Sequence, residues 1–410
     1  MDLIKKQFPF FENNKDVIYL DTAATALKPM TVIKSMNDFY SNNSANPHSQ
    51  DYGNASLASQ KILNVRKQAA NLLNANSENE IIFTEGTTYS LNQVAFGLMH
   101  LIDIDDEIII TNVEHSSNFA PWVTIAAQKQ AKLVFAPINN YGQIIIEDLS
   151  KIITSKTKII VFNHMSNVLG ATNDIKLIST IVKKINKNII ISVDAAQSIA
   201  HEQIDVQSYD IDFLSFSAHK FYGPFGCGIL WGKSQLLKIL KPLKVGGGSI
   251  YGYVEKNNLW ENNFLDLPFK LEAGTPNIPS IIGFGEAINF VNNIGINKIK
   301  QHELELKQYA RLLFKNLNNK KIKFLNLELD SPIIDFYVEG INSQDIGIYL
   351  WNDYKICVRT GKHCAKMLSQ LIKIESTIRV SFGVYNSKAE IDILKEALEN
   401  CENFINSILV

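Results

Sequence analysis

The sequence has few cysteines, almost no net charge and no long apolar run, and each absence excludes a class of protein. Its 4 cysteines in 410 residues make neither a disulfide framework nor a CxxC metal pair, so we expect free thiols and no structural metal. The formal net charge is −1, which argues against nucleic acid or an anionic membrane as a partner. No stretch has the apolar length of a signal peptide or of a membrane span, so we expect a cytoplasmic protein that works on small molecules.

Short apolar runs alternate with segments of helical spacing through most of the chain. The runs are rich in Ile, Val, Leu and Phe and end in polar residues, as buried strands do: EIIITNVEH, AKLVFAPI, TKIIVFNHMSN, KNIIISVDAAQ and IDFLSFSAHK. Between them, FAPWVTIAAQKQ and IKLISTIVKKINK have the spacing of crossover helices. The alternation predicts an α/β domain with a mainly parallel sheet. After about residue 285 the pattern changes, which predicts a second, smaller domain.

Polar residues stand where the predicted strands end. They are His115, Asn167, Asp194 and the pair His219–Lys220. Ligands of open parallel sheets bind outside the carboxyl ends of the strands. We therefore expect these residues to converge on one cleft.

Asp194 and Lys220 allow more than one interpretation. Asp194 could be a metal ligand, a helix N-cap or the partner of a cationic ring nitrogen, and no Cys/His spacing around it favours the metal. Lys220 could simply form a salt bridge with it. A lysine, a carboxylate, a histidine that can stack and a hydroxyl-rich turn are also the set that pyridoxal phosphate requires.

A phosphate site is predicted at Gly86-Thr87-Thr88, which opens an amphipathic helix. The free N–H groups of a helix start attract phosphate, and threonine hydroxyls add donors. Alone, such a turn is more often an ordinary helix cap. Ser217 and His219, just before the lysine, favour the phosphate site.

Ten segments, in order along the chain, carry a family resemblance. They are YLDTAATALKP, GTTYSLNQVA, EHSSNFAPW, HMSNVLGATNDI, VDAAQSIAHEQIDV, SFSAHKFYGPFGCGILWG, GGGSI, FKLEAGTPN, VRTGKHCAKML and IRVSFGVYN. The chain resembles a Suf-type (group II, NifS-like) cysteine desulfurase of the class V aminotransferase family.

The resemblance implies the PLP-dependent transferase fold type I. In that fold, a large domain with a mainly parallel seven-stranded sheet is joined to a smaller C-terminal α+β domain. We expect residues 16–284 to form the large PLP-binding domain and residues 285–410 to form the small domain with the catalytic cysteine loop. Residues 1–15 are expected to pack with the small domain.

The resemblance also assigns roles to the polar residues. Lys220 forms the Schiff base, His115 stacks on the pyridine ring, and Asp194 pairs with the ring nitrogen. The remaining residues are expected around the ring hydroxyl (Asn167, Gln197), around the phosphate (Thr87, Thr88, Ser217, His219), around a second subunit's phosphate in a homodimer (Thr275) and around the substrate (Arg379, Arg359, Asn167, His48).

Cys364 follows Gly361, Lys362 and His363 in a polar loop, where positive neighbours favour a thiolate. It matches the family's sulfur-accepting nucleophile. The implied reaction converts L-cysteine to L-alanine with a persulfide on Cys364. The sulfur then passes to a SufE-like or SufU-like acceptor for iron–sulfur cluster assembly.

Alternatives remain open. A selenocysteine lyase or another class V PLP enzyme, such as a plain aminotransferase, would share most motifs, and so would a non-catalytic PLP-binding scaffold of a sulfur-transfer complex. The chain also departs from the Suf-type pattern, because Ser49 and Glu85 stand where arginine is usual. These departures leave the identity of the acceptor open.

Overall fold

The structure is a computed structural model that describes residues 2–49 and 51–408. The helices are α1 (Asp2–Lys5), α2 (Pro9–Asn13), α3 (Met30–Asn42), α4 (Gly53–Leu73), α5 (Thr87–Leu98), α6 (Ser116–Lys129), α7 (Ile146–Ile152), α8 (Ile175–Ile185), α9 (Ser234–Ile239), α10 (Ile278–Ile294), α11 (Ile296–Phe314), α12 (Ser343–Tyr354), α13 (Lys366–Ile372) and α14 (Lys388–Ile408). The strands are β1 (Ile18–Tyr19), β2 (Ile81–Thr84), β3 (Glu107–Ile110), β4 (Lys132–Phe135), β5 (Thr157–Asn163), β6 (Ile190–Asp194), β7 (Phe213–Ser217), β8 (Gly228–Gly232), β9 (Ile250–Lys256), β10 (Leu259–Phe264), β11 (Ile322–Phe324), β12 (Ile333–Val338), β13 (Ile356–Cys357), β14 (Arg359–Gly361) and β15 (Thr377–Ser381).

A seven-stranded sheet is the largest element of the fold. Its strand order is β2-β8-β7-β6-β5-β3-β4, in which β8 is antiparallel to both of its neighbours and the other neighbouring pairs are parallel. The five apolar runs singled out in the sequence are β3 to β7 of this sheet. The predicted α/β class with a mainly parallel seven-stranded sheet is therefore confirmed.

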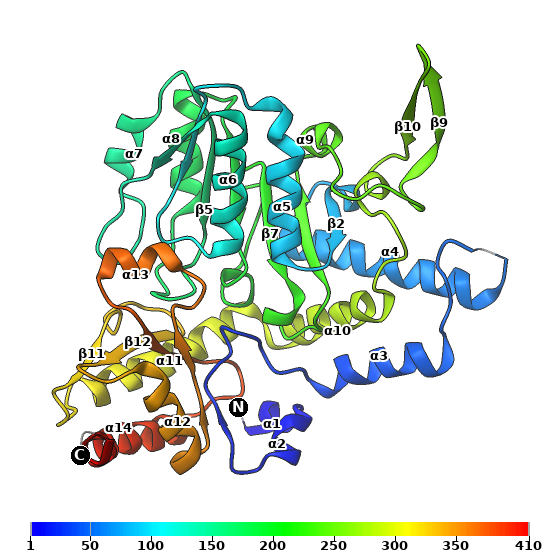
Figure 1. The fold of residues 1–410 in the computed structure, drawn as a ribbon. Helices are drawn as coiled ribbons and strands as arrows, with labels where there is room; N and C mark the ends of the chain where they lie inside the picture. Colours follow the sequence, from blue (N-terminus) through cyan, green and yellow to red (C-terminus); the bar gives the residue numbers. More distant parts are fainter. Residues whose placement is uncertain (1, 50, 409–410) are drawn as a thin grey trace.

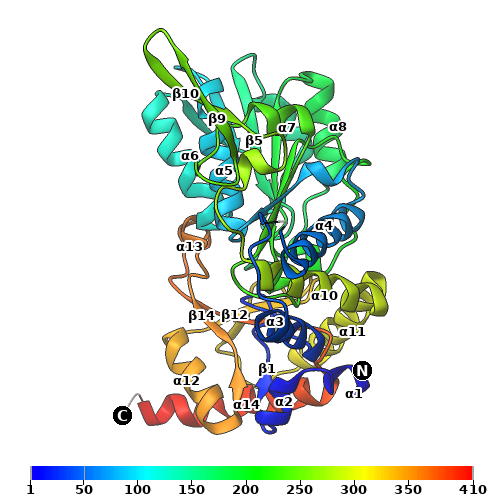
Figure 2. The same cartoon turned by 90° about the vertical axis from the view of Figure 1, so that its right-hand side faces the viewer.

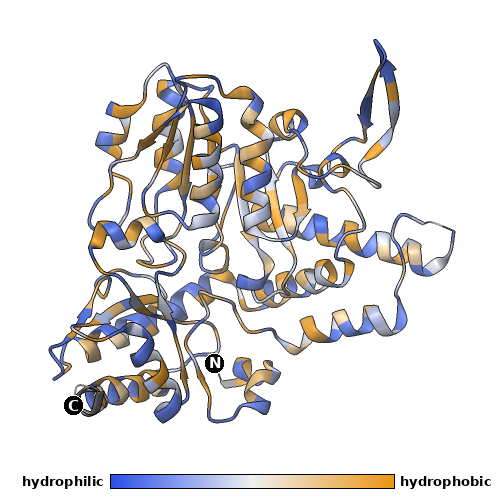
Figure 3. Cartoon of the chain, viewed as in Figure 1, coloured by the Kyte–Doolittle hydropathy of each residue, from blue (hydrophilic) through white to orange (hydrophobic). Residues whose placement is uncertain are grey.

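Helices cover both faces of this sheet, with α5 and α6 on one face and α4, α8 and α10 on the other (Figures 1 and 2). On β3, Ile108 and Ile110 belong to the core under α5 and α6, whereas Ile109 belongs to the opposite core. Successive side chains of a strand point to opposite faces, so a run of apolar residues is needed when both faces are covered. Figure 3 shows these hydrophobic residues gathered on the strands and on the helix faces that cover them.

A second, four-stranded antiparallel sheet has the order β11-β12-β15-β14 and packs with α11, α12 and α14 in a core of its own. The short strand β1 pairs in parallel with β13, so the start of the chain lies beside its last third. Phe8 packs against Tyr222, Phe290 and Tyr385. Helix α10 crosses residue 284, and the division into 1–15, 16–284 and 285–410 stays a prediction.

The hairpin of β9 and β10 projects away from both sheets (Figure 1), and the sequence patterns did not indicate it. Within residues 2–49 and 51–408, no helix combines the length and the apolar character needed to cross a bilayer. The same ranges contain no group of three or more His, Cys, Asp or Glu side chains that could hold a metal ion.

Candidate active site

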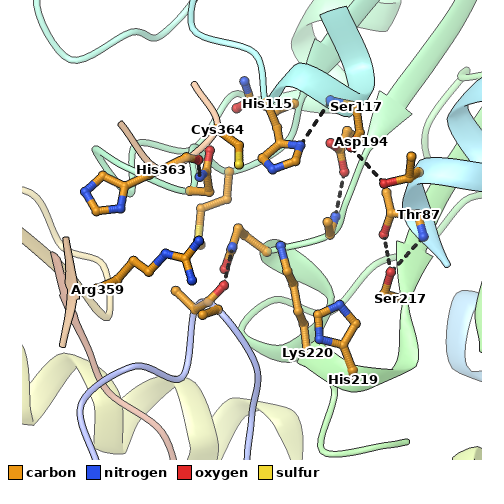
Figure 4. Close-up of a pocket in the computed structure, with 18 of the residues that line it drawn as sticks. Thr87, His115, Ser117, Asp194, Ser217, His219, Lys220, Arg359, His363 and Cys364 are labelled. Carbon is orange, nitrogen blue, oxygen red and sulfur yellow. Dashed lines mark hydrogen bonds between the residues drawn. The ribbon is translucent and has the colours of Figure 1, made fainter. Parts of the chain in front are cut away.

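A pocket of about 230 Å³ lies where the parallel strands of the large sheet end. It gathers residues from the large sheet, from the N-terminal segment and from the loop before α13 (Figure 4). Most of the predicted site residues line it: Thr87, Thr88, His115, Asn167, Asp194, Gln197, Ser217, His219, Lys220, Arg359, Cys364 and Arg379.

The N-terminus of α5 forms one end of the pocket. The Thr87 N–H donates to Ser217 Oγ over 2.7 Å, and the hydroxyls of the two residues also lie 2.7 Å apart. Gly86 has a φ of +149°, a value that favours glycine. A Cβ on Gly228 would lie 2.5 Å from the Gly86 Cα, so the two main chains are in direct contact. Glycine at both positions brings the helix end and its hydroxyls to the pocket, which suits an anion.

His219 supplies a further donor at this end. Its Nδ1 is buried without a hydrogen-bond partner among the described residues, and its ring stacks on Phe225 with centroids 5.3 Å apart. Burial lowers the pKa of His219 to about 3, with the charge of Lys220 adding to the effect. The imidazole is therefore uncharged and carries one N–H for a ligand.

Lys220 stands on a tight turn after β7. The N–H groups of Phe221 and Gly223 both donate to the Ala218 carbonyl, over 2.8 and 2.9 Å. A Cβ on Gly223 would lie 2.9 Å from that oxygen, so the turn requires glycine there. The Lys220 side chain extends into the pocket (Figure 4). Burial lowers the pKa of Lys220 to about 8, although the Asp194 carboxylate acts in the opposite direction.

Asp194 and His115 face the same space from β6 and from the start of α6. Asp194 Oδ1 accepts the Ala196 N–H over 2.9 Å, and burial raises the pKa of its carboxyl, against that bond and Lys220. His115 Nδ1 accepts the Ser117 N–H over 3.1 Å. Burial, helped by Lys220, lowers the pKa of His115 to about 4. His115 is therefore neutral near pH 7, with its proton on Nε2.

Glu114 supports the site, and sequence reasoning missed it. Its carboxylate is buried and accepts bonds from Thr111 Oγ1 (2.5 Å), Asn118 Nδ2 (2.6 Å), Asn163 N (3.0 Å) and Asn163 Nδ2 (2.9 Å). It thereby ties the ends of β3 and β5 to α6. Burial raises the pKa of Glu114 to about 7. In the sequence, the only sign that Glu114 belongs to the site was its position directly before His115.

Arg379 is buried at the side of the pocket formed by β15. It donates to the Asn167 carbonyl over 2.8 Å and to Asp21 Oδ1 over 3.3 Å, and its Nε has no hydrogen-bond partner among the described residues. Arg359 is exposed at the same pocket. Two guanidinium groups converge there, which suits a carboxylate ligand. Asp21 was not predicted, because no local pattern links it to residue 379.

The loop before α13 brings Cys364 to the pocket. The Cys364 carbonyl accepts from both the N–H and the hydroxyl of Ser116, each over 2.7 Å, and the His363 carbonyl accepts from Asn167 Nδ2 over 2.8 Å. The Cys364 side chain is directed toward His115 (Figure 4). Cys227 is buried and burial raises its pKa to about 12, so it does not resemble a nucleophile.

Two predicted residues lie outside this pocket. Thr275 lines a second cavity of about 530 Å³, together with Glu85 and Lys244, which form an ion pair. His48 lies beside Gly248, where an added Cβ would come within 3.3 Å of its ring. The role predicted for Thr275 concerns a second subunit, so it stays a prediction, as does that of His48.

The residues present fit pyridoxal 5′-phosphate. The unpartnered His219 Nδ1 and the Thr87–Ser217 hydroxyls suit a phosphate, Asp194 suits a protonated ring nitrogen, and Lys220 is an amine aimed into the space between them. The neutral ring of His115 lies on the same side of the pocket as Cys364 (Figure 4).

Residues 18–394 match the family model described as aminotransferase class-V. The chain therefore belongs to the class-V aminotransferase family, whose members use pyridoxal phosphate.

Relatives of this chain are described as cysteine desulfurases or probable cysteine desulfurases. A protein of Ureaplasma parvum serovar 3, described as a probable cysteine desulfurase, is 39% identical over 100% of both chains. The cysteine desulfurase of Wigglesworthia glossinidia brevipalpis is 37% identical over 98% of this chain and 97% of its own.

Solved structures agree with these relatives. The cysteine desulfurase CsdA of Escherichia coli, in an S-sulfonic acid form, superposes with a TM-score of 0.89 at 33% identity and covers 98% of both chains. The apo cysteine desulfurase of Thermococcus onnurineus NA1 has a TM-score of 0.90 at 32% identity, over 97% of this chain and 96% of its own.

Proposed function

We propose that this chain is a Suf-type cysteine desulfurase that converts L-cysteine to L-alanine, holds the sulfur as a persulfide on Cys364 and passes it to an acceptor protein for iron–sulfur cluster assembly. The observation that carries the proposal is that Lys220 and Cys364, which lie far apart in the sequence, line the same pocket. An amine suited to a carbonyl cofactor and a thiol suited to sulfur attack are thus within reach of one small substrate.

Several side chains bind and orient the reactants in this scheme. Thr87, Thr88, Ser217 and His219 hold the cofactor phosphate. Arg379, assisted by Arg359, holds the substrate carboxylate, because a planar fork of donors matches its two oxygens. When bound, pyridoxal phosphate supplies an electron sink that acidifies the substrate Cα.

Two side chains move protons. A pKa of about 8 leaves part of Lys220 uncharged near neutral pH, so its amine can take the Cα proton. His115 carries its ring proton on Nε2, because Nδ1 accepts the Ser117 N–H. That proton is available to the alanine fragment when the sulfur leaves.

Cys364 accepts the sulfur. Its thiolate attacks the substrate sulfur, a new S–S bond forms, and the Cβ–S bond breaks. The electron pair of that bond stays with the carbon fragment, which takes up protons and leaves as alanine. Cys364 is exposed, so a thiol of a SufE-like or SufU-like acceptor can then attack the outer sulfur and release the Cys364 thiolate.

The proposal includes a cytoplasmic homodimer in which Thr275 of one subunit reaches the phosphate site of the other. Thr275 lines a second cavity and not the pocket that holds Lys220 of the same chain, which supports a role toward another subunit.

The test is alanine and sulfide release from L-cysteine by the PLP-loaded protein, with dithiothreitol as reductant. We expect equal amounts of both products from the wild type, and loss of turnover with retained cofactor absorbance in Cys364→Ser. Cys357→Ser is the matched control, because burial raises the pKa of that thiol to about 11 and it does not line the pocket. Untouched cysteine, or an active Cys364→Ser variant, would contradict the proposal, and release of selenium in preference to sulfur would favour a selenocysteine lyase.

A further inference from the structure

Asp335 on β12 is a fully buried carboxyl group without a hydrogen-bond partner for either of its oxygens among the described residues. Burial raises its pKa well above the usual range, against the opposing effects of the nearby Thr377 hydroxyl, which does not reach hydrogen-bond geometry with Asp335, and of the Arg379 and Lys307 cations. A buried polar group without a partner costs about 1–3 kcal/mol. Such a cost in a folded protein calls for an explanation beyond packing.

His363, the residue before Cys364, lies next to this carboxyl. The distance from His363 Nε2 to Asp335 Oδ1 is 3.7 Å, and His363 Nε2 lies 2.9 Å from Thr377 Oγ1. Burial lowers the pKa of His363 to about 3, and the charges of Arg379 and Arg359 add to this. An uncharged imidazole and the Asp335 carboxyl therefore share one buried space.

His363 also connects the two sheets. Its side chain enters the four-stranded sheet at Thr377 and Asp335, while its carbonyl accepts from Asn167 beside the large sheet. His363 and Cys364 have φ values of 49° and 56°, so the chain reverses at this point. The imidazole points away from the pocket as Cys364 points into it (Figure 4). The place of the His363 ring thus sets the place of the Cys364 sulfur.

We propose that Asp335 is a positioning residue for Cys364, acting through His363. Asp335 borders the buried space on β12 and gives the imidazole a polar neighbour, so the ring stays between Asp335 on β12 and Thr377 on β15. The inference rests on the proposed function, because the atom being positioned is the sulfur acceptor.

The charged groups around the pair define its pH dependence. Lys307 faces Asp335 from α11, with its pKa lowered to about 7 by burial, and Arg379 faces it from β15, directly across the strand pair. Arg359 acts on His363 from β14. When Asp335 loses its proton, its charge attracts the His363 N–H and the Arg379 guanidinium. The bond of the imidazole to Thr377 is then weakened and the cysteine loop shifts.

The test compares Asp335→Val and Asp335→Asn in the PLP-loaded enzyme. Valine removes the polar neighbour but leaves no unpaired carboxyl, so the melting temperature should stay equal or rise. We expect kcat to fall on the order of tenfold, with an unchanged KM and cofactor spectrum, because the sulfur is misplaced by a fraction of an ångström. Asparagine keeps a polar neighbour and should retain kcat near neutral pH.

The second readout is the rate at which iodoacetamide alkylates Cys364, followed by mass spectrometry across neutral and alkaline pH. The alkylation rate rises with the thiolate fraction of Cys364 in every variant, and we expect a second inflection in the wild type that is absent in Asp335→Asn. Glu303→Gln is the matched control, because it alters another buried carboxyl–imidazole pair, with His201 at 2.7 Å, and should keep the wild-type profile.

Unchanged kcat and alkylation in Asp335→Val would overturn the positioning role, and so would parallel losses of stability and activity. These outcomes are distinct from failure of the proposed function, in which the wild type itself releases no alanine or the Cys364→Ser variant stays active.

Discussion

Replacing Arg379 by lysine tests how the pocket holds a substrate carboxylate. The variant keeps the positive charge beside Asp21, but an ammonium group cannot reproduce the planar fork. Arg379 is only 3% exposed and already donates to the Asn167 carbonyl and to Asp21, so its Nε–H, which has no partner among the described residues, and its remaining N–H bonds are left for a ligand. Loss of one charge-assisted hydrogen bond costs about 1.5–3 kcal/mol.

That loss corresponds to a rise of about 10- to 150-fold in the KM for L-cysteine. The kcat should change much less, because the bond exists in both the ground state and the transition state. Initial rates of alanine formation over a range of cysteine concentrations measure both constants. Arg311→Lys is a suitable control, since Arg311 binds Asp330 over 2.7 Å outside the pocket. A KM in Arg379→Lys equal to that of the control would refute the assignment.

Three further predictions concern protonation and stability. The apo protein should take up pyridoxal phosphate faster as the pH rises to about 8, above which the rate should level off, because only uncharged Lys220 bonds to the aldehyde. The rate is measured from the appearance of the visible absorbance, and a rate that does not depend on pH would contradict this prediction. Because the pKa of His115 is about 4, its imidazole is neutral at the pH values at which the enzyme works. His115→Gln should therefore lower kcat without moving the acid limb of the pH–rate profile. A shifted acid limb would show that His115 gains its proton within the pH range of that limb. Glu272 binds the buried Arg66 through both carboxylate oxygens, at 2.6 and 2.8 Å, so Glu272→Ala leaves a buried charge without its partner and should lower the free energy of unfolding in urea by about 3–5 kcal/mol. Asp148→Ala, which removes an exposed ion pair, should have little effect, and equal effects of the two variants would contradict this ranking.

The sequence was sufficient to predict the elements that depend on local patterns. The runs that became β5, β6 and β7 are continuous in apolar residues because helices cover both faces of the sheet, and their polar ends met at one pocket as the parallel arrangement requires. The family resemblance added Arg379 and Cys364, which no local pattern would have joined to Lys220.

The residues that were missed act through contacts between distant segments. Asp21 meets Arg379 across 358 positions, and Asp335 on β12 lies 3.7 Å from the ring of His363, which is in the loop after β14. An isolated aspartate in an apolar strand such as IIDFYV gives no sign of its partner, because the sheet register that supplies the partner is set by the whole fold. The β9–β10 hairpin was missed for a different reason: its strands are largely exposed, so they lack the apolar run that marked the others.

The sequence separation of Asp21 and Arg379 also bears on when a newly made chain can complete its pocket. At about 5–20 residues per second, roughly 20–70 s separate the synthesis of the two residues, which are 358 positions apart. Until Arg379 leaves the ribosome, Asp21 lacks its cation, and until residues 356–357 have been made β1 lacks its partner β13. A chain that ends before residue 364 therefore contains Lys220 and the residues of the phosphate end of the pocket but has neither Cys364 nor Arg379, so it lacks the sulfur acceptor.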